Sequence, residues 1–201
     1  MAGIPIVYRK GINRNIQTYD YIDIATGQKY VVLYCGDVQT GANVNAKIMG
    51  VNMYYSQNGW TTIANPIQID LDFDMPVDQT LEIRGDIILE IPNGSDQDNS
   101  SFPMSGAMYY VRAGSEVQIG ETNIGATSAN NTEDVTTIKI TAPRTIIKKG
   151  DTLRMNINAG ASPNTLTFFH DPKDRNFATV AGIGSGWITS QMKVHLPLSL
   201  D

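Results

Sequence analysis

The sequence predicts an all-β protein, an antiparallel β-sandwich of the jelly-roll type with an extended N-terminal arm. Apolar and polar residues alternate with a period of two, helical periodicity is nearly absent, and polar turn signals separate the short apolar runs. The chain has 201 residues, of which 41% are hydrophobic, so it can bury the core of one large domain. We therefore predict a single β-sandwich domain over residues 21–201.

Residues 1–20 do not follow the alternating pattern. They mix apolar and basic side chains, including Arg9, Lys10 and Arg14, in a chain with a formal net charge of -5. We interpret this segment as an arm whose basic residues contact a partner. A frayed terminus is the simpler alternative.

The clearest strand is predicted at residues 67–74, where Ile67, Ile69, Leu71 and Phe73 share one face and Gln68, Asp70, Asp72 and Asp74 the other. Residues 81–91 repeat the alternation, with Ile83, Ile87 and Leu89 on the core side. Gly85 within this second strand indicates a bulge or a bend. Because only a short turn separates the two strands, we predict an antiparallel hairpin.

Eight further strands are predicted at residues 30–35, 47–55, 108–113, 116–121, 135–142, 152–159, 165–170 and 188–198. The polar stretches 92–101 and 125–134 are typical of exposed loop tips. A set of short strands separated by turn signals favours a sandwich or a barrel.

Charge and composition exclude several classes of partner. No basic run is longer than Lys148-Lys149, so no basic stripe could neutralise a nucleic acid. The sequence shows neither a signal-peptide core nor eighteen consecutive apolar residues, so we expect a soluble chain without a membrane partner. Cys35, the single cysteine, lies in an apolar run and is expected to be a small buried hydrophobe.

The stretch FFHDPKDRNF could be a catalytic cluster, a metal site or a charged turn. Neighbouring residues at the end of a strand point to opposite faces, so His170 and Asp171 are poorly placed to pair. An aspartate before a proline favours a turn, and Asp174 and Arg175 can form an ion pair across it. We predict a structural turn formed by His170, Asp171, Pro172, Asp174 and Arg175, and no catalytic residue.

No zinc spacing connects His170 with His195. Asp70, Asp72 and Asp74 fall on one face of a strand at intervals of about 7 Å, which is too wide for one calcium ion. We expect a solvated acidic face there and neither a metal nor a cofactor, although a calcium ion shared with a loop stays an alternative.

Trp60 and Trp187 both follow turns that contain glycine, so their rings could be exposed. Exposed aromatic rings can stack on sugars or contact a protein partner. A carbohydrate-binding or host-adhesion module is therefore one alternative function.

Both ends of the chain resemble a type of structural protein of tailed phages and related viruses, in which an FxHDPxxR segment precedes a last strand of the form TxxKVxxPxxLD. The matching residues are Phe168, His170, Asp171, Pro172, Arg175, Lys193, Val194, Pro197, Leu200 and Asp201. The resemblance implies a jelly-roll-like capsid accessory protein without catalytic residues.

The function expected from this resemblance is a capsid decoration (cement) or minor capsid protein, which is not an enzyme. The expected partners are the major capsid protein and further copies of the chain in a homotrimer, because a sandwich leaves strand edges that need cover. The expected location is the virion, assembled in the host cytoplasm. A β-sandwich hydrolase is the enzymatic alternative, and it would need two carboxylates or a His–Asp pair in a cleft.

Overall fold

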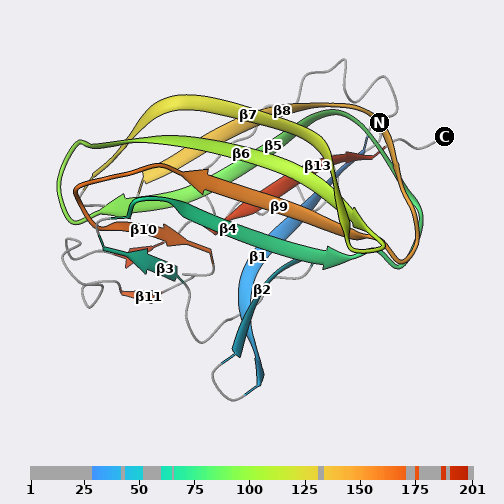
Figure 1. Cartoon of the computed structure of the whole chain (residues 1–201), viewed down its shortest axis with the longest axis horizontal. Coiled ribbons are helices and arrows are strands. Elements are labelled where there is room, and N and C mark those ends of the chain that lie inside the picture. Colours follow the sequence, from blue (N-terminus) through green and yellow to red (C-terminus); the bar gives the residue numbers. More distant parts are fainter. Residues whose placement is uncertain are drawn as a thin grey trace, which may run out of the picture.

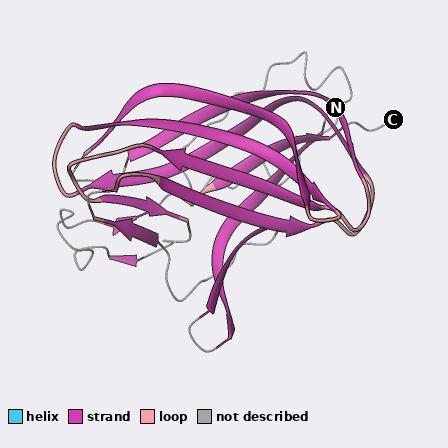
Figure 2. Ribbon diagram, in the orientation of Figure 1, coloured by secondary structure: helices cyan, strands magenta, loops and turns pink. Residues whose placement is uncertain are grey.

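The computed structural model describes residues 29–41, 44–51, 60–64, 66–130, 134–170, 175–176, 187–188 and 191–198. Within these ranges the chain forms strands and no helix, which confirms the all-β prediction (Figure 1, Figure 2). The strands are β1 (Lys29–Gly41), β2 (Val44–Gly50), β3 (Trp60–Ile63), β4 (Ile69–Pro76), β5 (Leu81–Ser95), β6 (Ser100–Arg112), β7 (Ser115–Ala129), β8 (Asp134–Ile147), β9 (Thr152–Ala159), β10 (Leu166–Phe169), β11 (Arg175–Asn176), β12 (Trp187–Ile188) and β13 (Lys193–Leu198). None of the described segments is a helix that could cross a membrane.

Eleven strands join into one sheet in the order β3-β10-β5-β13-β1-β2-β4-β9-β6-β7, with β8 added alongside β5. The pairs are antiparallel except for a short parallel contact between β2 and β4, at Ile48 and Asp74. Strands β11 and β12 form a small separate pair. The long β5 is the branch point, since it pairs with β8, β13 and β10.

The sheet folds over so that β6 and β7 face β5 and β8 across the core (Figure 1). A Cβ atom built on Gly106 of β6 would lie 2.6 Å from Leu89 Cδ1 of β5 and 3.2 Å from Ile138 Cδ1 of β8. A Cβ atom on Gly120 of β7 would lie 2.7 Å from Ile140 Cγ2 of β8. The two layers therefore approach closely where glycine replaces a larger side chain, and the buried aliphatic and aromatic residues fill the space between them.

The predicted core face of β4 and β5 is confirmed, but the predicted hairpin is wrong. The buried residues include Ile69, Leu71, Phe73, Ile83, Ile87 and Leu89, which are at most 5% exposed. Strand β4 pairs along its whole length with β9, whereas β5 pairs with β8. The turn after β4 leads into the other layer, and the backbone of Val77 bonds to Asp151 and Gly150.

Two local features adjust the sequence prediction at the ends and middle of these strands. Ile67 was expected in the core but is 88% exposed, because β4 begins only at Ile69 and residues 66–68 bend away from the sheet. Gly85 does mark a bulge: its φ is 114°, a conformation that favours glycine, and the register with β8 shifts between Ile83 and Gly85.

The two predicted loop tips are much shorter than their polar composition suggested. Residues 92–95 continue β5 and Ser100 begins β6, so only residues 96–99 connect them. The polar side chains here are buried because they bond to one another: Ser95 Oγ lies 2.6 Å from Ser100 Oγ. Asn93 Nδ2 donates to Ile91 O at 2.9 Å and to Thr136 Oγ1 at 2.8 Å. Residues 125–129 likewise continue β7.

Cys35 is fully buried in β1, as predicted, and burial raises the pKa of its thiol far above the ordinary value. Strand β2 ends at Gly50, and residues 52–55 of the strand predicted at 47–55 lie outside the described residues. The predicted arm at residues 1–20 lies outside them as well.

The turn between β8 and β9 is held by Asp151, a buried carboxylate. Arg112 donates to it from Nε at 3.0 Å and from Nη2 at 2.6 Å, and the backbone N–H of Lys148 donates at 2.8 Å. The hydrogen bonds from Arg112 hold the pKa of Asp151 below its ordinary value, against the opposing effect of burial. This contact fastens the end of β6 to the β8–β9 turn.

In Asp151→Asn, the free energy of unfolding should fall less steeply between neutral and acidic pH than it does in the unmodified chain. A carboxyl whose pKa is lower in the folded chain stabilises the fold above its unfolded pKa of about 3.9, and that contribution is lost as the pH falls through the folded pKa. Urea unfolding between pH 7 and pH 2 measures the slope. Arg112→Gln removes the donor and should flatten the curve in the same way. An unchanged slope in both variants would contradict the assigned role of the pair.

Candidate functional site

The outward side chains of β4, β9, β6 and β7 form a polar face made of three cross-strand rows. Asp70, Asp72 and Asp74 on β4 lie opposite Asn158, Asn156 and Arg154 on β9. On the other side of β9, Asn158, Asn156 and Arg154 lie opposite Ser105, Ala107 and Tyr109 on β6. These three β6 residues in turn lie opposite Asn123, Glu121 and Gln118 on β7. These residues, together with Glu116 on β7, are called the polar face below.

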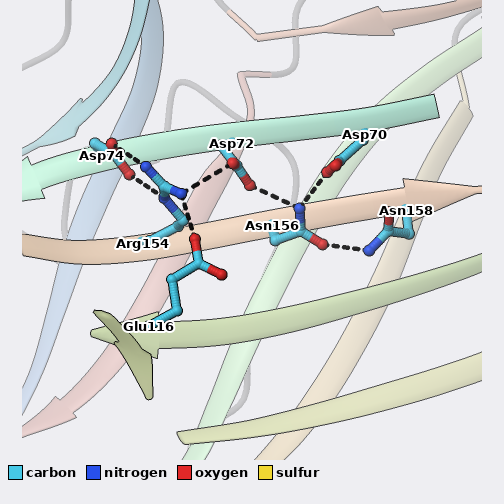
Figure 3. A network of polar contacts seen from close by, with 7 residues as sticks. All are labelled: Asp70, Asp72, Asp74, Glu116, Arg154, Asn156 and Asn158. Atoms are coloured by element: carbon cyan, nitrogen blue, oxygen red, sulfur yellow. Dashed lines mark hydrogen bonds and ion pairs between the residues drawn. The ribbon is translucent and has the colours of Figure 1, made fainter. Parts of the chain in front are cut away.

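Arg154 is the charged centre of the polar face (Figure 3). Its Nε and Nη2 each donate to a different oxygen of Asp74 at 2.7 Å. Its Nη1 lies 3.2 Å from Asp72 Oδ2 and 2.5 Å from Glu116 Oε1. The hydrogen bonds that Arg154 donates to Asp74 raise the pKa of Arg154 beyond its already high ordinary value. One guanidinium thus holds three carboxylates from two strands in place.

Asn156 continues the polar network from Arg154 toward one end of the face (Figure 3). Its Nδ2 donates to Asp70 Oδ1 at 2.5 Å and to Asp72 Oδ1 at 2.7 Å. Its Oδ1 accepts a hydrogen bond from Asn158 Nδ2. Asp70 and Asp72 fix the orientation of the Asn156 amide, and Asn156 in turn fixes the orientation of the Asn158 amide. The Oδ1 of Asn158 is therefore left as an acceptor for another group.

The polar face carries a negative potential. Five carboxylates, those of Asp70, Asp72, Asp74, Glu116 and Glu121, stand against the single guanidinium of Arg154. The negative charge also acts on Tyr109. Burial raises the pKa of its hydroxyl, and the charges of Glu121, Glu116, Asp72 and Asp70 raise this pKa further. Cationic groups are therefore the natural counterparts of this surface.

A pocket of about 300 Å³ opens at the Asn158 end of the polar face. Its polar lining comes from Gln68, Ser105, Asn123 and Asn158, and its apolar lining includes Ile67, Pro103 and Ala159. The pocket is a shallow depression that combines hydrogen-bonding side chains from three strands with a small apolar wall, so a small molecule can contact both.

A second charged cluster lies at the β5–β13 contact, and it is buried. Glu90 Oε2 lies 3.5 Å from Lys193 Nζ, and Glu90 Oε1 lies 3.7 Å from His195 Nε2. Burial acts to raise the pKa of Glu90, but the hydrogen bond with His195 and the charge of Lys193 hold it below the ordinary value. The three side chains are between 6% and 13% exposed, so this cluster serves the packing of the sheet.

His170, the first residue of the predicted turn, is fully buried. Its Nε2 lies 3.2 Å from Thr61 Oγ1, and its ring centroid lies 5.8 Å from that of Phe73. His195 lies instead opposite Ile88 of β5, so the two histidines occupy different settings. Neither ring is open to a substrate from solvent.

The remaining residues of the predicted turn and of the predicted partner contacts cannot be placed as side chains. Asp171, Pro172 and Asp174 lie outside the described residues, and Arg175 is described only as a backbone partner of Ile188. The same holds for the basic residues Arg9, Lys10 and Arg14, which are outside the described ranges. Trp60 pairs with Phe169 and Trp187 with Asn176 through their backbones. These assignments stay predictions.

The acidic face predicted at Asp70, Asp72 and Asp74 exists, but it is bonded to β9 rather than merely solvated. Sequence analysis missed Arg154, Asn156 and Asn158. The alternation in RMNIN was the available signal, since it placed these three polar residues on one face of a predicted strand. Within the described ranges, no three His, Cys, Asp or Glu residues are grouped so as to hold a metal ion.

No family model and no curated protein matches this chain in sequence. Solved structures do match in fold. A CocE/NonD family hydrolase from Staphylococcus aureus aligns at a TM-score of 0.57 and 11% identity, over 86% of this chain and 37% of the hydrolase. An α-amino acid ester hydrolase aligns at 0.50 and 10% identity, over 84% and 36%. An aminopeptidase from a marine sediment archaeon of the Thaumarchaeota aligns at 0.54 and 8% identity, over 85% and 37%.

The chain therefore has a fold found within hydrolases and spans little more than a third of the length of these enzymes. This finding overturns two expectations, that the chain is a capsid decoration or minor capsid protein and that it is not an enzyme. Structures of infectious bursal disease virus align only at TM-scores of 0.26 and 0.24, which are too low to support a shared fold. The residues behind the viral resemblance include Val194, which is buried in β13, and His170, which is buried directly after β10.

Proposed function

We propose that this chain is the β-sandwich domain of a hydrolase and that its polar face and pocket bind the substrate. The observation that carries the proposal is the fold match to three hydrolytic enzymes over 84–86% of this chain. One of these structures is named as an α-amino acid ester hydrolase and another as an aminopeptidase, so amino-acid esters and peptides are the first substrates to test.

The exposure of the side chains indicates which residues can contact a substrate. His170 is fully buried and His195 is 5% exposed, so neither can exchange protons with a substrate in solvent without a rearrangement. The pocket, in contrast, is open and is lined by Gln68, Asn123 and Asn158. These side chains offer hydrogen bonds to a substrate but are not nucleophiles or proton carriers, so we assign to the pocket the task of binding and orienting.

The test is to mix the purified chain with methyl esters and 4-nitroanilides of several L-amino acids and to follow binding by NMR and turnover by absorbance. We expect saturable binding that Gln68→Ala weakens about threefold to tenfold, the effect of one lost hydrogen bond. Gln79→Ala is the matched control, because Gln79 is an exposed glutamine beyond the other end of β4. If none of the compounds bound and none were turned over, the proposal would be overturned. Equal binding by Gln68→Ala and the unmodified chain would remove the pocket from it.

A further inference from the structure

We infer that the pocket beside Asn158 selects ligands that carry a primary ammonium group next to a small apolar group. This inference deepens the proposed function, on which it rests, because it names the class of ligand that the same pocket takes. The pocket volume of about 300 Å³ suits a molecule of the size of a single amino-acid derivative.

Ser105 supplies the observation that points to a ligand. It is only 9% exposed, and it lies on the β6 strand between Asn158 and Asn123, with which it lines the pocket. Met104 before it and Gly106 after it face the core, so its hydroxyl faces the pocket. Among the described residues, no hydrogen bond is formed by this hydroxyl. A hydroxyl that opens into the pocket from a residue otherwise nearly buried is placed to bond a ligand.

The acceptors in the pocket and beside it favour an ammonium ligand. Asn158 and Ser105 line the pocket, and Asp70 lies beside it as the next member of the same cross-strand row, on strands about 4.8 Å apart. Asn158 offers its Oδ1 as the acceptor, because its Nδ2 donates a hydrogen bond to Asn156 Oδ1. An ammonium group has three N–H donors and no acceptor, so a ligand seated over Asn158 can satisfy this oxygen and reach its neighbours on either side.

Charge and shape exclude the nearest rivals to an ammonium group. A carboxylate or phosphate would meet the negative potential of Asp70 and Asp72, and the cation of the polar face, Arg154, already holds three carboxylates. A bare metal ion would need several carboxylate ligands, whereas the polar side chains that line the pocket, Gln68, Ser105, Asn123 and Asn158, are all neutral.

The apolar part of the ligand has its own wall. Ile67 is 88% exposed at the edge of the pocket, and Pro103 and Ala159 complete the apolar side. The Pro103 side of this wall is held in place, because the backbone N–H of Gly160 donates to Pro103 O at 2.8 Å and a Cβ atom on Gly160 would overlap the proline ring. A fixed wall lowers the entropy that binding costs.

The experiment compares L-leucinamide with N-acetyl-L-leucinamide, which lacks the ammonium charge, by NMR titration of the full chain. We expect L-leucinamide to bind at least about tenfold more tightly at pH 6.5 and to lose this advantage at pH 9.5, above the α-amino pKa of about 7.7–8.0. Asp70→Asn keeps an acceptor for Asn156 and should weaken binding of L-leucinamide about fivefold to tenfold. Asp78→Asn is the control, since Asp78 is an exposed aspartate beyond the other end of β4.

The outcomes separate this inference from the proposed function. Equal affinity for the two amides, or equal effects of Asp70→Asn and Asp78→Asn, would overturn the ammonium preference and leave a substrate-binding pocket in place. If neither amide binds and the esters and anilides also fail, the inference and the proposed function fall together. Ser105→Ala provides a second measure, because it removes the buried hydroxyl with little change of volume, and we expect it to weaken binding of L-leucinamide about threefold.

Discussion

Leu71→Asp should leave the chain unfolded in neutral buffer. Leu71 is 5% exposed in the middle of β4, and its side chain packs in the core between the two layers. Keeping a new buried carboxyl protonated at pH 7 costs about 4 kcal/mol, and losing a buried leucine costs about 2–5 kcal/mol more. The sum is comparable to the whole stability of a typical domain, about 5–15 kcal/mol. Circular dichroism and urea unfolding of the purified variant measure the effect.

Asp72→Asn is the matched control for this prediction, because Asp72 is the next residue of β4 and faces outward. Its side chain is 38% exposed, and an asparagine can still accept the hydrogen bond from Asn156 Nδ2. We expect a loss of at most about 1 kcal/mol, the usual value of a partly exposed ion pair. Equal tolerance of the two substitutions would mean that the two faces of β4 are assigned the wrong way round.

Alternation along β4 was enough to predict which side chains are buried, but it could not predict the neighbouring strand. The inward positions of Leu71 and Phe73 follow from a period of two, whichever strand lies alongside. Pairing depends on where the following turn leads, and residues 77–80 lead into the other layer. A short turn between two amphipathic strands therefore fits a hairpin within one layer and a crossing between layers equally well.

The same limit explains what was missed at the site. Asp70, Asp72 and Asp74 were predicted to share a face, and they do. Their partners on β9 are 80 or more residues away in sequence, and only the β4–β9 register brings Arg154 and Asn156 beside them. The pocket depends in addition on the register between β9 and β6 and on the departure of Ile67 from the strand, neither of which alternation specifies.

Polar composition misled the prediction at residues 92–101 for a different reason. Serine and asparagine are typical of exposed loops because their polar groups bond to water. Here Asn93, Ser95 and Ser100 donate or accept hydrogen bonds among themselves or with neighbouring strands, which lowers the cost of burying them. Composition records the need for hydrogen bonds but not whether water or protein supplies them.

Lys193→Met should be the most damaging single change outside the hydrophobic core. Lys193 and Glu90 lie on paired strands with side chains that are 13% and 7% exposed. Removing Lys193 leaves the buried Glu90 carboxylate with His195 as its remaining partner in this cluster, so we expect a loss of about 3 kcal/mol in the free energy of unfolding. Urea unfolding at pH 7 measures this loss.

The double variant Glu90→Leu with Lys193→Met tests whether the loss comes from the stranded charge or from packing. A buried ion pair replaced by apolar side chains of similar volume is often neutral for stability, so the double variant should recover most of the 3 kcal/mol. The pH gives an independent check: in Lys193→Met the Glu90 carboxyl can take up a proton as the pH falls, whereas in the unmodified chain its pKa is held low. The stability difference between the single variant and the unmodified chain should therefore shrink between pH 7 and pH 4. A double variant as unstable as Lys193→Met, with a difference that does not depend on pH, would show that the lysine stem, and not its charge, stabilises the contact between β5 and β13.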